Sequence, residues 1–152
     1  MDDIFFATLW PPAKKYFEAI RKDVEEHYTV KQQDFYKLGK REFKRFMFKM
    51  YKPDKTPQSR INKKYRAMSK HGQNISILHI VVPDPTMQPH KKTRLKGTFY
   101  CLEMKRLKRK IRSVWAPKIK GYVYDIVMHI NDNEKHNIRT LRLLKKYAKK
   151  IN

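Results

Sequence analysis

Apolar residues along the chain follow two alternating patterns, and each pattern predicts a different kind of element. Short apolar runs that include aromatic or β-branched residues are typical of buried strands. Apolar residues that recur three and four positions apart predict helices with one buried face. By the first pattern we predict strands at residues 4–10, 28–38, 75–82 and 122–130.

Helices are predicted in the intervals between these strands. The apolar step from Ile20 to Val24 in the first interval is one example of the helical spacing. The predicted helices span about residues 12–27, 40–51, 60–71, 98–115 and 133–151. Residues 83–97, "PDPTMQPHKKTRLKG", show no period and contain three prolines, so we expect a long loop there. Loops of this length are often functional or mobile.

The alternation of strands and helices predicts the fold class. A strand followed by a helix and another strand is typical of crossover connections between parallel strands. We therefore predict a small three-layer α/β fold, with a mainly parallel sheet of about four strands flanked by helices. The 152 residues show neither an internal repeat nor a linker, which favours a single α/β domain over residues 1–152.

The charge of the chain changes this picture most. Lysine and arginine total 37 against 14 acidic residues, for a formal net charge of +23. Such an excess indicates a polyanionic partner, which can be nucleic acid, a nucleotide or anionic lipid. The alternative is that lysines only cover solvated helix faces, but glutamate usually rises with lysine in that case and acids are scarce here.

Composition also predicts where the protein works. No apolar run approaches the roughly 20 residues that span a bilayer. The chain starts with Asp2 and Asp3, unlike the basic start of a signal peptide. A lone cysteine, Cys101, cannot form an intramolecular disulfide. These features predict a cytoplasmic protein.

Polar residues follow three of the predicted strands, where a parallel sheet binds its ligands. If the strands run in one direction, these residues share one edge of the sheet. There, His129 is predicted as a general acid or base, and Asp132 and Asp84 as carboxylates that orient it or bind a divalent cation such as Mg²⁺. The predicted substrate-binding residues are Trp10, Lys14, Lys15, Asn133 and His136, with the two lysines as an anion clamp.

Residues 129–137 admit three interpretations. They can form the catalytic site just described. His129, Asp132 and His136 also have the ligand types of a two-histidine, one-carboxylate metal site. In the third interpretation they only start the last helix, because Asn131, Asp132 and Asn133 are all good N-cap residues and Asn131 with Glu134 resembles a capping box.

Two predicted helices carry basic faces that suit phosphate contacts without base recognition. The loop at residues 89–97 adds further cations. The predicted nucleic-acid-binding residues are Lys105, Arg106, Arg109 and Arg112 on one helix and Arg139, Arg142 and Lys146 on the last.

Motifs narrow the function only by their absence. No GxGxxG, GxxxxGK, CxxC, HExxH or GxSxG sequence is present, which disfavours a Walker ATPase, a zinc ribbon and a serine hydrolase. We expect a protein that binds or acts on a phosphate-rich ligand, nucleic acid or nucleotide, by acid/base or metal-assisted phosphoryl chemistry. The alternatives are a non-catalytic nucleic-acid-binding accessory protein and an interaction protein for an acidic protein partner. Whether the protein is an enzyme is left open.

Overall fold

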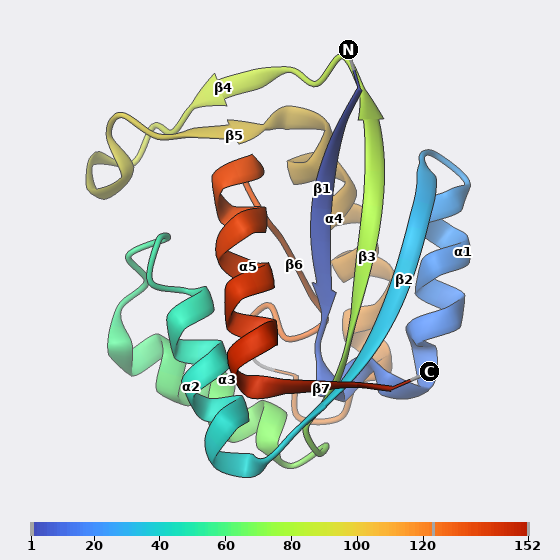
Figure 1. Ribbon diagram of the computed structural model, residues 1–152, viewed down its shortest axis with the longest axis vertical. Coiled ribbons are helices and arrows are strands. Elements are labelled where there is room, and N and C mark those ends of the chain that lie inside the picture. Colours follow the sequence, from blue (N-terminus) through green and yellow to red (C-terminus); the bar gives the residue numbers. More distant parts are fainter. Residues whose placement is uncertain (1, 123, 152) are drawn as a thin grey trace.

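A five-stranded sheet forms the centre of the computed structural model, which describes residues 2–122 and 124–151 (Figure 1). Its strands lie in the order β6-β1-β3-β2-β7. The two long central strands, β1 and β3, are largely apolar and are buried over most of their length. The bounds of the five strands are β1 (Asp2–Leu9), β2 (Thr29–Leu38), β3 (Asn74–Pro83), β6 (Met128–Ile130) and β7 (Ala148–Ile151).

Helices connect these strands, and their amphipathic faces account for where they pack. Within the described residues no helix is long and apolar enough to cross a membrane. Short 3-10 turns, η1 (Pro11–Tyr16) and η3 (Ala116–Lys118), flank two of the helices. The helices are α1 (Phe17–Glu25), α2 (Lys40–Met50), α3 (Gln58–Ser69), α4 (Leu102–Trp115) and α5 (Glu134–Tyr147).

Every neighbouring pair in this sheet is antiparallel, so the prediction of an α/β fold with a mainly parallel sheet of about four strands is wrong. The reason lies in the crossovers. The connection from β1 through α1 to β2 passes over β3, and the connection from β3 through α4 to β6 passes over β1. Strands joined by each crossover are parallel to each other, but an antiparallel strand separates them. Alternating strands and helices therefore do not specify parallel neighbours.

The helices lie on both faces of the sheet. Figure 1 shows α4 behind the sheet and α5 in front of it, with α2 and α3 beside α5. The core between these layers is aromatic at one end, where the fully buried Trp10 packs against Phe43, Phe46 and Tyr51. Helix α2 supplies two of these rings, which fixes the α2–α3 segment against the end of β1.

The edge strand β6 is shorter than the predicted strand at 122–130, and a side chain replaces the missing part. β6 pairs with residues 7–9 of β1, and the Asn131 N–H donates to the Phe6 carbonyl, which leaves the Phe6 N–H and the Ile4 carbonyl without a strand partner on that side. Asn137 of α5 accepts a hydrogen bond from the Phe6 N–H at 3.1 Å and donates one to the Ile4 carbonyl at 2.7 Å. Its side-chain amide thus acts as the next peptide unit of the sheet.

The chain end adds a strand that the sequence pattern does not indicate. The predicted last helix at 133–151 ends at Tyr147 in the structure, and Ala148 already has an extended backbone. Residues 148–151 pair with β2 as β7. The lysine-rich sequence "AKKI" is compatible with a helix, and the pairing with β2 decides its conformation instead.

Two short strands form a hairpin that extends from the body (Figure 1). Strands β4 (Met87–Pro89) and β5 (Phe99–Cys101) pair, and a 3-10 turn, η2 (Thr93–Leu95), lies at the tip. We call residues 87–101 the basic arm, because they carry four lysines and arginines and no acid. The predicted loop at 83–97 is therefore partly ordered as a hairpin.

Candidate functional site

A cavity of about 450 Å³ lies between the basic arm, the α2–α3 segment, α4, and β6 with the turn that follows it. Residues far apart in the sequence meet in its walls. Tyr51 and Lys64 come from the α2–α3 segment, His90 from the arm, Arg112 from α4, and Asp132 from the turn after β6. Its volume is typical of a site for a small ligand or for one unit of a larger one.

Positive charge dominates the walls of this cavity. Among the described residues, nine lysine and arginine side chains line it against three carboxylates, Asp54, Asp125 and Asp132. Clustered cations in a concave site concentrate anions there. The nine basic residues are Arg60, Lys64, Lys91, Lys92, Arg94, Lys105, Lys108, Arg109 and Arg112.

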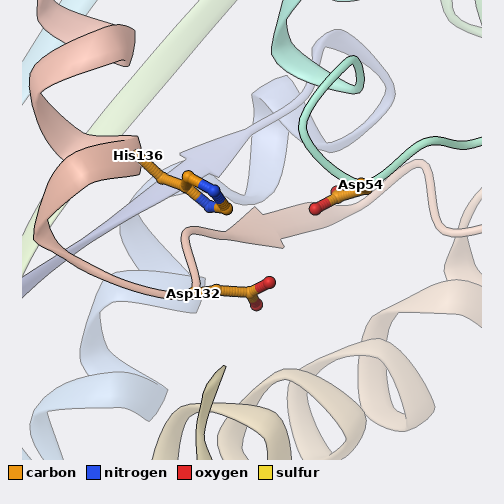
Figure 2. Close-up of side chains that lie close together, drawn as sticks. All are labelled: Asp54, Asp132 and His136. Carbon is orange, nitrogen blue, oxygen red and sulfur yellow. The ribbon is translucent and has the colours of Figure 1, made fainter. Parts of the chain in front are cut away.

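Three metal-ligand side chains converge beside the cavity. Each of Asp54, Asp132 and His136 offers one ligand atom, and these atoms lie within 4.8 Å of one another. Figure 2 shows the carboxyl groups and the imidazole ring pointing toward one another. Asp54 lies in the turn after α2, Asp132 in the turn after β6, and His136 in the first turn of α5. The cluster thus depends on tertiary structure.

Burial and the repulsion between the two carboxylates shift the pKa values in this cluster. A bound cation would counteract that repulsion. Burial, together with the neighbouring Asp132, raises the pKa of Asp54 to about 6. Burial lowers the pKa of His136, although Asp132 opposes that shift, so the imidazole is neutral near pH 7. Two carboxylates and a neutral imidazole form a donor set that fits a divalent cation.

A fourth side chain fixes one of these carboxylates. The Nε2 atom of His90 lies 2.9 Å from Oδ2 of Asp132. His90 belongs to the basic arm, and its ring also packs on Tyr100 at 4.9 Å. Hydrogen bonds of this kind orient metal-binding carboxylates. The contact also ties the arm to the cluster.

Lys64 is an unusual residue in the cavity wall because its side chain is 5% exposed. Its ammonium group lies 4.3 Å from the centre of the Tyr51 ring, a cation–π contact. Burial lowers the pKa of Lys64 to about 8, and the nearby Asp125 opposes that shift. A buried cation costs stability, and ionisable groups with pKa values shifted by burial occur often in ligand sites.

Helix α4 presents two further cations to the cavity. Arg112 donates to the Met128 carbonyl at 2.9 Å and forms an ion pair with Asp125 at 3.2 Å. Lys108 is half-buried, and burial together with Arg112 lowers its pKa. Because Arg112 is anchored on two sides, its position relative to β6 is fixed.

His129 lies in the wall of the same cavity. It pairs with Thr8 across β6 and β1, and its ring packs edge-on against Tyr51 at 5.2 Å. Burial, with Lys108 and Arg112 nearby, lowers its pKa well below the usual 6.5. The imidazole is therefore neutral near pH 7, a state that can accept a proton but cannot donate one as an imidazolium acid.

Antiparallel strands separate residues that were expected to share one edge. Asp84 follows β3 next to Asp2, whereas His129 pairs with Thr8, six residues further along β1. At roughly 3.3 Å per residue that is about 20 Å. Asp84 therefore does not meet His129, and the expected gathering at one edge is wrong for it.

The predicted substrate-binding residues at the end of β1 lie elsewhere as well. Trp10 is fully buried in the aromatic core and presents no surface to a ligand. Lys14 and Lys15 are exposed on η1 and line a separate hollow of about 750 Å³ beside β2 and α1. Asp132 lines the same cavity as His129, and His136 lies in the cluster with Asp132, whereas neither Asn133 nor these three residues line the cavity.

The capping interpretation of residues 129–137 is confirmed in part. Asn133 is the N-cap of α5, and its side chain accepts from the His136 N–H at 3.1 Å. Asn131 does not cap, because its amide donates to Asn137 and Thr140 inside the core. His136 is half-buried beside Asp132, so one segment both starts the helix and contributes to the cluster.

The two basic helices do not form one surface, because α4 and α5 lie on opposite faces of the sheet (Figure 1). From α4, Lys105, Arg109 and Arg112 line the cavity, whereas Arg106 does not. From α5, Arg139 donates to the Lys49 carbonyl at 3.1 Å. Arg142 and Lys146 are exposed and lie outside the cavity.

Asp54, Lys64 and Lys108 were not among the predicted site residues. Lys64 and Lys108 lie in lysine-rich helices, where nothing in the pattern separates them from solvated neighbours. One signal was available for Asp54. It is the only acidic residue between Glu42 and Asp84, in a stretch otherwise rich in lysine and arginine.

One comparison with known proteins supports the fold, and none adds a relative in sequence. No protein-family model matches the chain, and no curated protein matches it. Among solved structures, it is similar to the nucleoside diphosphate kinase of Aquifex aeolicus, with a TM-score of 0.56 and 10% identity over 95% of each chain. For an NDP kinase from Pyrobaculum aerophilum the TM-score is 0.46 and the identity 13%, over 94% of this chain and 95% of that one. The Aquifex likeness, like the strand order, indicates a ferredoxin-like fold.

Proposed function

We propose that this protein binds the phosphate groups of a nucleotide or nucleic acid in the cationic cavity and acts on them with a divalent cation. The observation that carries the proposal is the meeting of nine basic side chains with the cluster of Asp54, Asp132 and His136. Cations that hold a phosphate beside carboxylates that hold a metal are the arrangement that phosphoryl chemistry uses.

In this proposal one set of residues binds the metal and another binds the phosphate. Asp54, Asp132 and His136 would hold the cation, which when bound polarises a phosphoryl oxygen. Magnesium prefers oxygen ligands, and the imidazole makes manganese or another transition metal the better match. Lys64, Lys108 and Arg112 would hold the phosphate oxygens, and Arg112 is positioned for this by its contacts to β6 and Asp125.

His129 would take a proton from the attacking hydroxyl or water. Burial keeps this imidazole neutral near pH 7, as a proton acceptor must be, and its low pKa also makes it a weaker base than an exposed histidine. The Aquifex neighbour is named as a kinase of nucleoside diphosphates, so its fold is compatible with such a reaction. At 10% identity this likeness shows the fold alone, and the proposed function rests on the residues of the cavity.

Product formation tests the proposal. Labelled oligonucleotides and nucleoside triphosphates are incubated with the protein in Mg²⁺, Mn²⁺, Ca²⁺ or EDTA. We expect turnover that EDTA abolishes and that Asp132→Asn reduces by at least about a hundredfold, since a charged carboxylate ligand is replaced by a neutral amide. Asp3→Asn, at an exposed position of β1, is the matched control. Turnover that survives both EDTA and Asp132→Asn would refute the assignment.

The second candidate is a non-catalytic nucleic-acid-binding protein. The excess of cations over acids favours it equally, because cations alone account for affinity. The two candidates differ at the cluster. A pure binding protein shows no product in any metal, and Asp132→Asn leaves its affinity for nucleic acid unchanged or slightly higher because one negative charge is removed.

A further inference from the structure

Lysine side chains lie on the surface outside the cavity as well as in its walls. Lys96 on the basic arm and Lys63 on α3 are both exposed, and neither lines the cavity. Lys63 lies 6.0 Å from the ring centre of Tyr124, which lines the cavity, and Lys96 directly follows Leu95, which also lines it. Figure 1 shows the two elements that carry these lysines, the arm at the upper left and α3 at the lower left. The positively charged surface thus extends beyond the cavity.

The size of the cavity limits the form of the ligand. A volume of about 450 Å³ holds a small ligand and excludes a double helix, whose bases are stacked inside it. A single strand can place one nucleotide in a pocket without the cost of unpairing. The cavity therefore fits one unit of a chain whose remaining units lie outside.

An aromatic side chain lies among the cations at the cavity wall. Tyr124 is 38% exposed, with the Arg60 guanidinium 5.4 Å and the Lys63 ammonium 6.0 Å from its ring centre. Exposed aromatic rings beside cations are the means by which proteins bind single strands, the ring under a base and the cations on phosphates. Tyr124 also has a φ of +42°, which a non-glycine residue rarely adopts.

We propose that the ligand is a single-stranded polynucleotide. One nucleotide occupies the cavity with its base on Tyr124, and the neighbouring phosphates lie over Lys63 on one side and Lys96 on the other. This inference rests on the proposed function and specifies its substrate class. A mononucleotide would use the cavity but would reach neither Lys63 nor Lys96.

Fluorescence anisotropy tests the inference with a labelled single strand of about a dozen nucleotides. The same sequence as a duplex, and ATP, are the competitors, and EDTA prevents turnover of the probe. We expect the single strand to bind more tightly than the duplex, and ATP to compete only at much higher concentration. Tyr124→Leu should weaken the single strand at least about fivefold, through the loss of stacking.

The double variant Lys63→Gln/Lys96→Gln tests the proposed phosphate contacts outside the cavity. Each lost phosphate contact lowers the salt slope of single-strand binding by about 0.7, so the pair should lower it by about 1.4. ATP affinity should not change with it. Lys31→Gln/Lys37→Gln, two exposed lysines of β2 away from the cavity, is the control and should leave the slope at its original value.

Other results would overturn the inference in separable ways. If ATP competes as well as the single strand and the Lys63→Gln/Lys96→Gln slope is unchanged, the substrate class is wrong and the proposed function stands. Equal affinity for the duplex, or equal competition by polyglutamate, also overturns it. If neither the single strand nor ATP binds at about 50 mM salt, the proposed function fails together with the inference.

Discussion

Acidification should weaken divalent-metal binding at the cluster of Asp54, Asp132 and His136. A metal binds the deprotonated forms of its ligands, so protons compete with it. Among the three ligands, Asp54 determines the pH range, because burial and Asp132 raise its pKa to about 6. His136 has a pKa lowered by burial, so its protonation competes only at lower pH and in the same direction.

The magnitude follows from the pKa of Asp54. At pH 5, one unit below about 6, roughly nine-tenths of the Asp54 carboxyl is protonated before the metal binds. Affinity should therefore be about tenfold weaker at pH 5 than on the plateau above pH ~7. Binding at pH 5 should release about 0.9 proton, and binding at pH 7 about 0.1.

Isothermal titration with Mn²⁺ in two buffers of different ionisation enthalpy measures both the affinity and the released protons. Asp54→Asn keeps an oxygen ligand but cannot titrate. The change in metal affinity between pH 5 and pH 7, the pH step, should therefore shrink to the part that His136 contributes. Asp3→Asn should retain the full step. Affinity that is independent of pH in the wild type, or an equal step in Asp54→Asn, would refute the placement of the metal.

Three further changes test the energetics of the site and its support. Lys64→Met should stabilise the protein by roughly 1–3 kcal/mol in urea unfolding, since it removes a buried charge, while it weakens ligand binding; destabilisation would contradict this. Asn137→Ala should cost about 2–4 kcal/mol, because it leaves backbone groups of β1 unpaired; a loss below about 1 kcal/mol would count against the role of its amide in the sheet. His129 is neutral when folded, so its contribution to stability is lost as pH falls below about 6.5, where the unfolded chain takes up the proton, by up to about 1.4 kcal/mol per pH unit. Thermal unfolding between pH 7 and 5 should show a smaller decline for His129→Phe, and an unchanged decline would contradict the burial effect.

The sequence predicted the elements well and their directions badly. The strands at 4–10, 28–38 and 75–82 correspond to β1, β2 and β3, because their apolar runs report burial directly. Strand direction depends on which strand lies between two others, and no local pattern encodes that. For the same reason β7 could not be predicted from the sequence. Its four residues are extended because they pair with the edge of β2.

Residues of the candidate site could be proposed from the sequence where one segment holds several of them. His129, Asp132 and His136 are close in sequence, so they stay close whatever the sheet topology is. Asp84 depended on a parallel β3, and the antiparallel pairing places it at the far end of β1. Trp10 was chosen for its position after a strand, but a large apolar ring at that point is core as readily as site.

Asp54 could not be connected with Asp132 without the structure. The two lie 78 positions apart, and the packing of α2 against α5 brings their turns together. The sequence offered only the isolation of Asp54 among basic residues. Charge patterns of this kind mark a residue as unusual, and its partner appears only when the fold is known.

The most direct measurement is a crystal structure with Mn²⁺ and an uncleavable single-stranded oligonucleotide. We predict an anomalous peak bound by Asp54, Asp132 and His136, with a backbone phosphate in the cavity in contact with Lys64 or Arg112. A manganese ion bound elsewhere, or an oligonucleotide on a surface away from the cavity, would contradict the account.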